Sequence, residues 1–324
     1  MQIGKINIKK PVFLAPMEDV TDIPFRRLCK SFGADVLTTE FVSSDALVRN
    51  VKRTISKMAF MEDERPIGIQ IYGHDISTMI EAAKIVEEQK PDFIDLNFGC
   101  PVKKVVRRGA GAGMLRDIPK MIEMTTKIVR SVSLPVSAKT RIGWDDSSMI
   151  NLTDMIKKFQ DTGIQFLTLH FRTRQQMYTG KADWSWMEKI NTNIGISLPI
   201  VGNGDIINGL FAKEKFDYYN VSGIMIGRAS IGNPWIFKTI KAELNGESQV
   251  RIPTLKEKVA VAIKHLENNV AYYGEHIGVK LMRRHFVQYF KGIPNFRQTK
   301  IKLLTSNDAE ENKSILQFIA NNYD

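Results

Sequence analysis

The chain has 324 residues, 43% hydrophobic and 25% charged, a composition that excludes disordered and collagen-like chains and allows a sizeable core. No apolar run approaches the ~20 residues of a membrane-spanning helix, and the start, MQIGKINIKK, lacks a secretory signal, so we expect a cytoplasmic protein that stays out of membranes. The 46 Lys and Arg residues outnumber the 35 Asp and Glu residues, and the net charge of +11 indicates a polyanionic partner.

Eight short apolar or β-branched runs are predicted strands, because Pro, Gly or Asp bounds each of them. The runs begin near Val12, Ala34, Ile67, Phe93, Val136, Phe166, Ile200 and Ile224. Their spacing leaves room for a helix after each strand. Segments 75–89, 117–132 and 149–162 carry apolar residues at helical period, with Asp or Ser near the start.

Eight strand–helix units predict an α/β fold, a closed (β/α)8 TIM barrel. The alternative is an open doubly wound sheet. Such a sheet usually has fewer parallel strands and carries a Gly-rich phosphate loop after strand one, where this sequence has Ala15-Pro16-Met17.

The strand–helix alternation stops near Leu244, and from Pro253 onward the pattern is helical only. We predict a barrel over residues 1–244 and a small all-helical domain over residues 245–324. No acidic residue stands between His276 and Asn307, whereas seven basic residues do: Lys280, Arg283, Arg284, Lys291, Arg297, Lys300 and Lys302. A charge run is ordinarily a solvated helix face, and that interpretation stays open beside a polyanion-binding surface. Aromatic residues interleave with these charges, but Phe286 and Phe290 at i, i+4 spacing are better explained as core than as base-stacking groups.

In a barrel of this type the chemistry belongs at the carboxyl ends of the strands. The residues there are Pro16, Met17, Glu40, Gln70, Asn97, Cys100, Lys139, Arg141, His170, Arg172, Asn203, Asp205, Gly227 and Arg228. Lys139 lies in a strand that should be buried on both faces, and a buried Lys needs an anionic partner. His170 has the alternative of a structural histidine bonded to a carbonyl. Together they indicate a site for an anionic or electron-rich ring.

Strands seven and eight end in GNGD (202–205) and GR (227–228), and barrels often bind phosphate with the loops after these two strands. Glycines let backbone N–H groups approach phosphate oxygens, and Arg228 can pair with them bidentately. Gly-rich turns at strand ends are common, so neither turn alone indicates a phosphate site. The evidence is that both turns follow the two strands whose loops often bind phosphate in barrels.

The two cysteines are too few for a disulfide framework, and no Cys/His pair has zinc-ligand spacing, so we expect no metal. Cys29 has the spacing of a packed helix face. Cys100 follows strand four in DLNFGCP, on a loop over the barrel mouth, and no Ser/His/Asp set competes with it as a reactive group. The following KKVVRRGAGAG (103–113) adds four positive charges and three glycines that can face phosphates.

Five segments resemble the tRNA-dihydrouridine synthases, and their order and spacing are most similar to the bacterial DusB subfamily. The segments are LAPMEDVTDIPFR (14–26), DLNFGCP (95–101), HFRTRQQMYTGKADW (170–184), GNGDI (202–206) and GIMIGRASIGNPWIF (223–237). The resemblance covers nearly all of residues 10–320. It implies FMN at the barrel mouth, NADPH as reductant and reduction of the C5–C6 double bond of selected uridines in tRNA.

By resemblance, the residues that hold FMN are Pro16, Met17, Gln70, Lys139, His170, Asn203, Gly204, Asp205, Gly227 and Arg228. The FMN phosphate lies at Asn203, Gly204, Gly227 and Arg228, and Lys139 and His170 lie near the pyrimidine side of the flavin. Cys100 is the acid that gives a proton to uracil C5. Those expected to contact the uracil or the tRNA are Asn97, Arg141, Lys103, Lys104, Arg172, Arg283 and Arg284.

The sequence departs from the family pattern at two places. Glu18 and Asp19 stand where many members have small residues, and they place carboxylates close to the flavin loop. Phe171 occupies a position often filled by Gly, so the chain path after strand six is expected to differ.

Two other functions stay open. One is a flavin barrel acting on a free pyrimidine, similar to dihydroorotate dehydrogenase, although a small substrate needs no basic 276–307 surface. The other is a tRNA-binding protein without catalysis, which Cys100, Lys139 and His170 disfavour. The sequence does not identify the modified uridine. It does not fix the oligomeric state either, for which a monomer is the working expectation.

Overall fold

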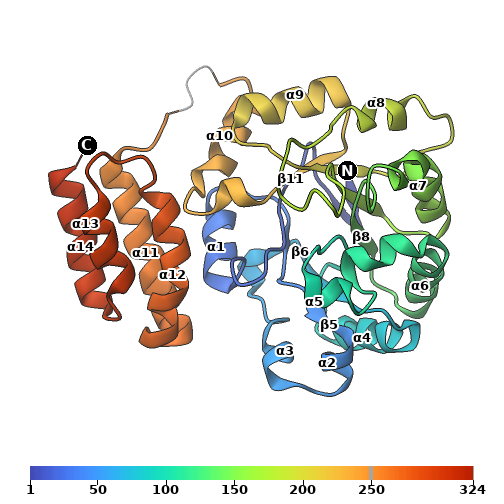
Figure 1. Ribbon diagram of the computed structural model, residues 1–324, viewed down its shortest axis with the longest axis horizontal. Coiled ribbons are helices and arrows are strands. Elements are labelled where there is room, and N and C mark those ends of the chain that lie inside the picture. Colours follow the sequence, from blue (N-terminus) through green and yellow to red (C-terminus); the bar gives the residue numbers. More distant parts are fainter. Residues whose placement is uncertain (248–250, 324) are drawn as a thin grey trace.

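The computed structural model describes residues 1–247 and 251–323 and has the predicted (β/α)8 barrel followed by a helical region (Figure 1). The barrel strands are β3 (Val12–Leu14), β4 (Leu37–Thr38), β6 (Ile67–Tyr72), β7 (Phe93–Phe98), β8 (Val136–Arg141), β9 (Phe166–His170), β10 (Ile200–Asn203) and β11 (Gly223–Ile226). Each predicted run contains one of these strands. Their order in the sheet is β3-β11-β10-β9-β8-β7-β6-β4, and every pair is parallel.

The ring closes between the first and second barrel strands, which excludes the open doubly wound sheet. Phe13 pairs with Val36 in an isolated parallel bridge. The backbone N–H of Leu14 donates to Val36 O at 3.0 Å, and that of Asp35 donates to Val12 O at 2.8 Å. One further short strand, β5 (Val42–Ser43), pairs with β6 beyond the end of β4. A closed ring of parallel strands brings all the carboxyl ends to one mouth.

Side chains alternate along each strand between the barrel interior and the surrounding helices. The interior face of the sheet supplies an apolar cluster near the amino ends of the strands: Phe13, Val36, Phe93, Phe166, Val201 and Met225. The other face, which includes Ile94, Leu96 and Leu169, packs with the helices. Continuing along the interior face toward the mouth, the side chains become polar.

The helices around the barrel are α1 (Ile23–Ser31), α2 (Ser44–Val48), α3 (Lys52–Ser56), α4 (Ile76–Glu88), α5 (Lys103–Val106), α6 (Ile118–Ser131), α7 (Leu152–Asp161), α8 (Trp186–Asn191), α9 (Gly209–Tyr219) and α10 (Trp235–Leu244). The three helices predicted at 75–89, 117–132 and 149–162 are therefore confirmed. α7 begins at Leu152 because Ser148–Asn151 forms a 3-10 turn. The Ser148 hydroxyl stabilises the preceding bend by accepting from the backbone N–H groups of Trp144 and Asp145.

The amino-terminal residues form a ribbon that the sequence patterns did not indicate. β1 (Gln2–Ile3) and β2 (Ile6–Asn7) are antiparallel and are joined at Gly4, whose φ is +57°. Ile3 is buried and packs with the interior cluster. The ribbon therefore lies at the end of the barrel opposite the mouth.

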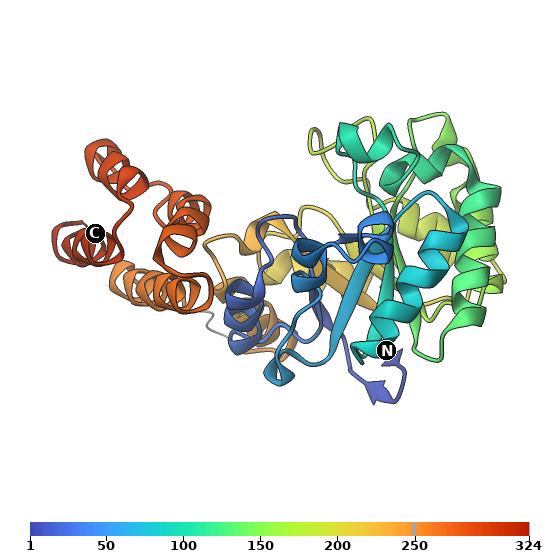
Figure 2. The same ribbon diagram turned by 90° about the horizontal axis from the view of Figure 1, so that it is seen from below.

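Four helices form the C-terminal region: α11 (Leu255–Tyr273), α12 (Glu275–Tyr289), α13 (Arg297–Thr305) and α14 (Ala309–Asn322). In both views they lie to one side of the barrel, next to α1 (Figure 2). Their core contains the four aromatic residues Phe286, Tyr289, Phe290 and Phe296, which are all buried. Burial of Phe286 and Phe290 agrees with their interpretation as core residues. Within the described ranges, none of the helices has the length and apolarity to cross a membrane.

Helix α1 of the barrel packs against the C-terminal helices. The ring of Phe25 lies 5.5 Å from that of His265 and 4.6 Å from that of His285, centroid to centroid. α10 ends at Leu244, where we placed the division between domains, but its first residue, Trp235, packs in the helical core. The division at 244/245 stays a prediction.

A glycine contact between the two parts gives a test of this docking. Gly232 has φ +61°, and a Cβ there would meet Tyr289 N at 2.5 Å and His285 O at 2.8 Å on α12. Gly246 has φ +77°, but a Cβ there meets nothing within 4 Å among the residues that the structure describes. Both substitutions to Ala carry the cost of a positive φ, whereas only Gly232→Ala adds a clash. We expect the free energy of unfolding, measured by urea denaturation, to fall by about 1–3 kcal/mol more in Gly232→Ala than in Gly246→Ala. Equal losses would show that the two parts separate without cost.

Candidate active site at the barrel mouth

A cavity of about 910 Å³ opens at the carboxyl ends of the strands. Of the residues predicted to form the site, those that line the cavity are Pro16, Met17, Asn97, Cys100, Lys139, Arg141, His170, Arg172, Asn203, Gly204, Asp205, Gly227 and Arg228. Gln70, Lys103, Lys104, Arg283 and Arg284 are not among its lining residues. The fold thus collects most of the predicted residues from strand ends and loops that are far apart in the sequence.

Lys139, His170 and Asn203 form the floor of the cavity. Asn203 Nδ2 donates to Met225 O at 2.8 Å, so the amide oxygen faces Lys139, whose Nζ lies 3.4 Å away. Burial, reinforced by the charge of Arg141, lowers the pKa of Lys139 to about 8. Burial and the nearby Lys139 and Arg141 charges hold the pKa of His170 well below its usual value, so its ring is neutral. A long contact to one amide leaves the Lys139 ammonium able to bind an anionic group in the cavity.

The loops after β10 and β11 each carry a glycine at the barrel mouth. Gly204 has φ +134°, and a Cβ there would lie 2.6 Å from Ala182 Cβ. Gly227 precedes the 3-10 turn Arg228–Ser230. The first N–H groups of such a turn have no acceptor within it. Arg228 is more than half exposed, and its Nη2 lies 3.3 Å from Asp205 Oδ1.

Arg172 is 2% exposed and is bonded inside the protein. Its Nη2 donates to Asp205 Oδ2 at 2.6 Å and to Gly180 O at 2.7 Å, and its Nε donates to Thr179 O at 3.1 Å. Asp205 therefore links two arginines, the buried Arg172 and the exposed Arg228. In this structure Arg172 holds the 179–180 loop, and its contact with a substrate stays a prediction.

Cys100 lies at the rim of the cavity and is 8% exposed. Its backbone N–H donates to Asn97 Oδ1 at 2.9 Å, and its carbonyl accepts from Ala112 N at 3.0 Å. Burial raises the pKa of its thiol above the usual value, so the thiol is protonated at neutral pH. Cys29 is completely buried in α1, as its spacing predicts.

Arg141 braces the loops on the Cys100 side of the cavity. Its Nε donates to Gly99 O at 2.8 Å, and its Nη1 donates to Thr173 O and Met177 O, both at 2.9 Å. Burial lowers its pKa to about 10, so it remains charged at neutral pH. A rigid cation thus stands beside the thiol.

The lining residues that the sequence analysis did not place at the site include Phe41, Tyr178, Gln288 and Lys291. Tyr178 is about half exposed, and its ring centroid lies 5.8 Å from Arg141 Cζ and 5.5 Å from Arg228 Cζ. An aromatic in the loop after strand six was a signal for it. Gln288 and Lys291 come from the helical region, and no local pattern indicates that they reach the barrel mouth.

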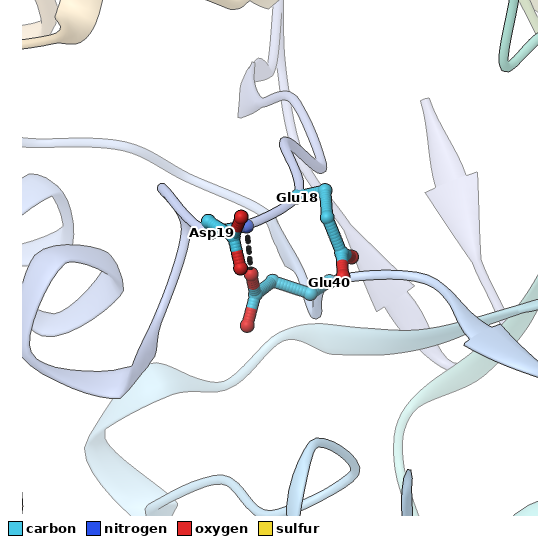
Figure 3. A group of neighbouring side chains, drawn as sticks. All are labelled: Glu18, Asp19 and Glu40. Carbon is cyan, nitrogen blue, oxygen red and sulfur yellow. Dashed lines mark hydrogen bonds between the residues drawn. The ribbon is translucent and has the colours of Figure 1, made fainter. Parts of the chain in front are cut away.

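Glu18, Asp19 and Glu40 bring three carboxylates together beside the cavity (Figure 3). Glu18 forms an ion pair with Lys57, and Glu40 accepts from the backbone N–H of Asp19, whose φ is +56°. Burial raises the pKa of Glu40, and the charge of Lys57 opposes that shift. Two of the carboxylates thus have partners within the protein, and the group stabilises the loop after β3. We assign no metal to it.

The second departure, Phe171, is accommodated by the core. Its ring is buried and lies 4.5 Å from that of Trp184, centroid to centroid. Its backbone N–H donates to Asn203 O at 3.0 Å, which continues the pairing of β9 with β10. The side chain therefore points away from the cavity.

The basic residues outside the cavity differ in whether their side chains are exposed or bonded within the protein. Lys103 and Lys104 are exposed on α5, directly after Cys100. Arg284 is exposed on α12, whereas Arg283 Nη2 donates to Ser306 O at 3.1 Å and to Asn307 Oδ1 at 2.9 Å. Arg283 thus stabilises the packing of the helical region, and its role toward tRNA stays a prediction.

A (β/α)8 barrel with a protonated thiol, a half-buried lysine and glycine-containing loops after β10 and β11 at its mouth has the architecture of a barrel enzyme. Residues 13–323 match the dihydrouridine synthase (Dus) family. The chain therefore belongs to the dihydrouridine synthase family, as the sequence resemblance indicated.

Individual relatives agree with this assignment. A probable tRNA-dihydrouridine synthase of Rickettsia bellii is 35% identical over 309 residues, which are 95% of this chain and 94% of the relative. tRNA-dihydrouridine synthase B of Pasteurella multocida is 37% identical over 301 residues, 92% and 90% of the two chains. The same enzyme of Pseudomonas aeruginosa is 34% identical over 321 residues, 99% and 96%.

A likeness to a solved structure supports the fold alone. Histamine dehydrogenase from Rhizobium sp. 4-9 superposes with a TM-score of 0.57 at 13% identity, over 83% of this chain. This chain spans half of that longer protein.

The state of the two thiols is directly measurable. Since burial raises the pKa of both, alkylation by iodoacetamide should be slow for Cys100 at pH 7.5 and should still be accelerating above pH 9, because only the thiolate reacts. Cys29 should stay unlabelled until urea unfolds the protein. Mass spectrometry of the labelled peptides gives both rates. A Cys100 rate that levels off below pH 8 would contradict the protonated thiol.

Proposed function

We propose that this chain reduces the C5–C6 double bond of selected uridines in tRNA, with FMN bound at the barrel mouth and NADPH as the reductant. The observation that carries the proposal is the convergence of Cys100, Lys139 and Arg141 on one cavity beside a basic surface. Family membership supplies the reaction class.

The residues of the cavity fit a flavin mononucleotide. A volume of about 910 Å³ lies within the range of about 300–1,000 Å³ usual for cofactor sites. The half-buried Lys139 ammonium, with one long contact to Asn203, suits the electron-rich pyrimidine side of the ring. Gly204, Gly227 and Arg228 suit the phosphate, since glycines let backbone N–H groups approach its oxygens and Arg228 is an exposed cation. Pro16 and Met17 offer apolar contact on the opposite side.

When bound, FMN would take hydride from NADPH and deliver it to uracil C6. The chain's own residues complete the reduction. Hydride at C6 leaves negative charge on the uracil, and the Cys100 thiol gives its proton to C5, so one hydride and one proton are added. Arg141 lies beside the thiol to stabilise the thiolate that remains. Asn97 uses one N–H of its amide within the protein and has a second for the uracil edge.

The tRNA would lie across the mouth and the helical region. A base must leave its stack to enter the cavity, which costs a few kcal/mol and calls for many phosphate contacts. Exposed Lys103, Lys104 and Arg284 and the cavity residue Lys291 supply charge on two sides of the opening.

The two alternative functions account for fewer of these observations. An enzyme acting on a free pyrimidine does not need Gln288 and Lys291 of the helical region at the mouth. A tRNA-binding protein without catalysis does not need the buried charge of Lys139, which is costly to hold inside a barrel.

Cys100→Ala separates the two half-reactions. The purified variant should keep its FMN and its oxidation of NADPH, because the thiol acts after hydride leaves the flavin. Its formation of dihydrouridine in tRNA should fall by roughly 10²–10⁴-fold, the usual contribution of general acid catalysis. Flavin absorbance, NADPH absorbance and dihydrouridine by mass spectrometry measure the three quantities. Near-normal dihydrouridine formation would remove Cys100 from the mechanism, and a parent protein without flavin would remove the function itself.

The basic surface is tested with Arg284→Glu and Lys291→Glu together, since Arg283 is bonded within the fold. The KM for tRNA should rise, and the log–log salt slope should fall by about 0.7–0.9 for each lost phosphate contact. Lys256→Glu is a control for each of the two substitutions, because it makes the same charge change as either one alone at an exposed position of α11. A salt slope equal to that of the parent protein would show that the basic 276–307 segment is an ordinary solvated helix face and does not contact tRNA phosphates.

A further inference from the structure

Below the cavity, a buried row of polar side chains crosses the barrel interior from β8 to the Cys100 loop. Asp95 is 2% exposed and Gln70 is 0% exposed. Asp95 Oδ1 accepts from Ser137 Oγ at 2.6 Å, and Asp95 Oδ2 accepts from Gln70 Nε2 at 2.5 Å. Gln70 Oε1 accepts from Asn97 Nδ2 at 2.8 Å. Asn97 Oδ1 then accepts from the backbone N–H groups of Gly99 at 3.1 Å and Cys100 at 2.9 Å.

The register of the sheet places these side chains side by side. Asp95 of β7 pairs with Gln70 of β6 on one flank and with Ser137 of β8 on the other. The row therefore rests on three adjacent strands of the barrel and not on loops. Such a support is rigid, since ladder hydrogen bonds hold each strand against the next.

The direction of every hydrogen bond in the row is determined at its two ends. A backbone N–H can only donate, so the amide of Asn97 must turn its oxygen toward Gly99 and Cys100. Its nitrogen then faces Gln70, and the nitrogen of Gln70 must face Asp95. A carboxylate only accepts, so Asp95 completes the row in the single orientation that leaves no member without a partner.

Resting on the function proposed above, we propose that Asp95 is a positioning residue, which acts through Gln70 and Asn97 to hold the Gly99–Cys100 backbone and thereby the acid thiol over the substrate cavity. Asp95 does not line the cavity. In this structure Gln70 is bonded to Asp95 and Asn97, beneath Asn97, and therefore does not line the cavity.

The geometry also explains the unusual choice of a carboxylate inside a barrel. An apolar residue there would leave the Gln70 nitrogen unpaired in a buried place, which costs free energy and frees the amide to rotate. An asparagine can still accept from Gln70, provided that its own nitrogen donates to the Ser137 hydroxyl. Ser137 accepts as well as donates, so the hydroxyl decides whether Asn is tolerated.

These relations define a set of four variants. Asp95→Leu has a similar branched shape and removes the acceptor. Asp95→Asn keeps the acceptor while Ser137 is present, and Ser137→Ala leaves the Asp95–Gln70 bond intact. Asp95→Asn combined with Ser137→Ala leaves an amide nitrogen without an acceptor, so its loss should exceed the sum of the two single losses.

We expect Asp95→Leu to lower kcat for dihydrouridine formation between about 10-fold and 100-fold, because a displacement of about 1 Å is enough for such a loss. The KM for tRNA, the FMN content and NADPH oxidation should stay near parent values. Asp95→Asn and Ser137→Ala should each keep kcat within about 3-fold of the parent, whereas the double variant should resemble Asp95→Leu. If Asp95→Leu does not fold, the double variant carries the same test.

A second readout is independent of the reaction. Iodoacetamide should alkylate Cys100 faster in Asp95→Leu and in the double variant than in the parent. The reason is that the loop no longer holds the thiol in its largely buried position. A role in global stability alone would lower the melting temperature without a selective rise in Cys100 labelling.

Three results would overturn the proposal: parent kcat in Asp95→Leu, a kcat loss that is matched by loss of FMN and of NADPH oxidation, or parent labelling rates in the variants with lowered kcat. A parent protein that forms no dihydrouridine would overturn the proposed function instead. In that case the labelling rates still decide whether Asp95 holds the Cys100 loop.

Discussion

Closure of the ring of parallel strands is the constraint on which the site depends. The contact of Phe13 and Leu14 with Val36 joins the first strand to the second, although both strands are short. Because every strand runs in the same direction, closure directs all the carboxyl ends to one mouth. Residues after the first strand, such as Pro16, and residues after the last strand, such as Arg228, then face the same cavity. Without closure, the first and second strands would lie at opposite edges of a sheet, and their loops would not meet.

Inside the ring, apolar side chains give way to polar ones toward the mouth. Phe13, Phe93 and Phe166 fill the amino-terminal end. Above them, buried polar groups satisfy one another, as Asp95 does with Gln70 and Ser137. Buried polar groups must be paired, so this layer is rigid. Groups nearest the mouth, such as Lys139, still have hydrogen-bonding or charge capacity for a ligand. The paired layer therefore supports the site, and the groups above it are available to bind a ligand.

The helical region contributes to the same site through its docking. Phe25 packs against His265 and His285, and Gly232 lets α12 approach the chain before α10 without a Cβ between them. This close contact brings Lys291 to the cavity. A substrate too large for the cavity would thus meet charge on the barrel and on the helices at once, and the orientation of the two parts would decide which nucleotide reaches the mouth.

The sequence by itself determined the strand–helix units, the closed barrel and most of the polar residues that line the cavity, because alternation along strands and the position of a residue at a strand end are local properties. It also determined the family, through short segments such as DLNFGCP. Tertiary structure alone decided that Arg172 and Arg283 are bonded inside the protein while Arg228 and Arg284 are exposed. It alone placed Lys291 at the mouth and Asp95 beneath Cys100. These outcomes depend on which segments meet across the closed ring and the domain contact, and no local pattern in one chain segment records its distant neighbours.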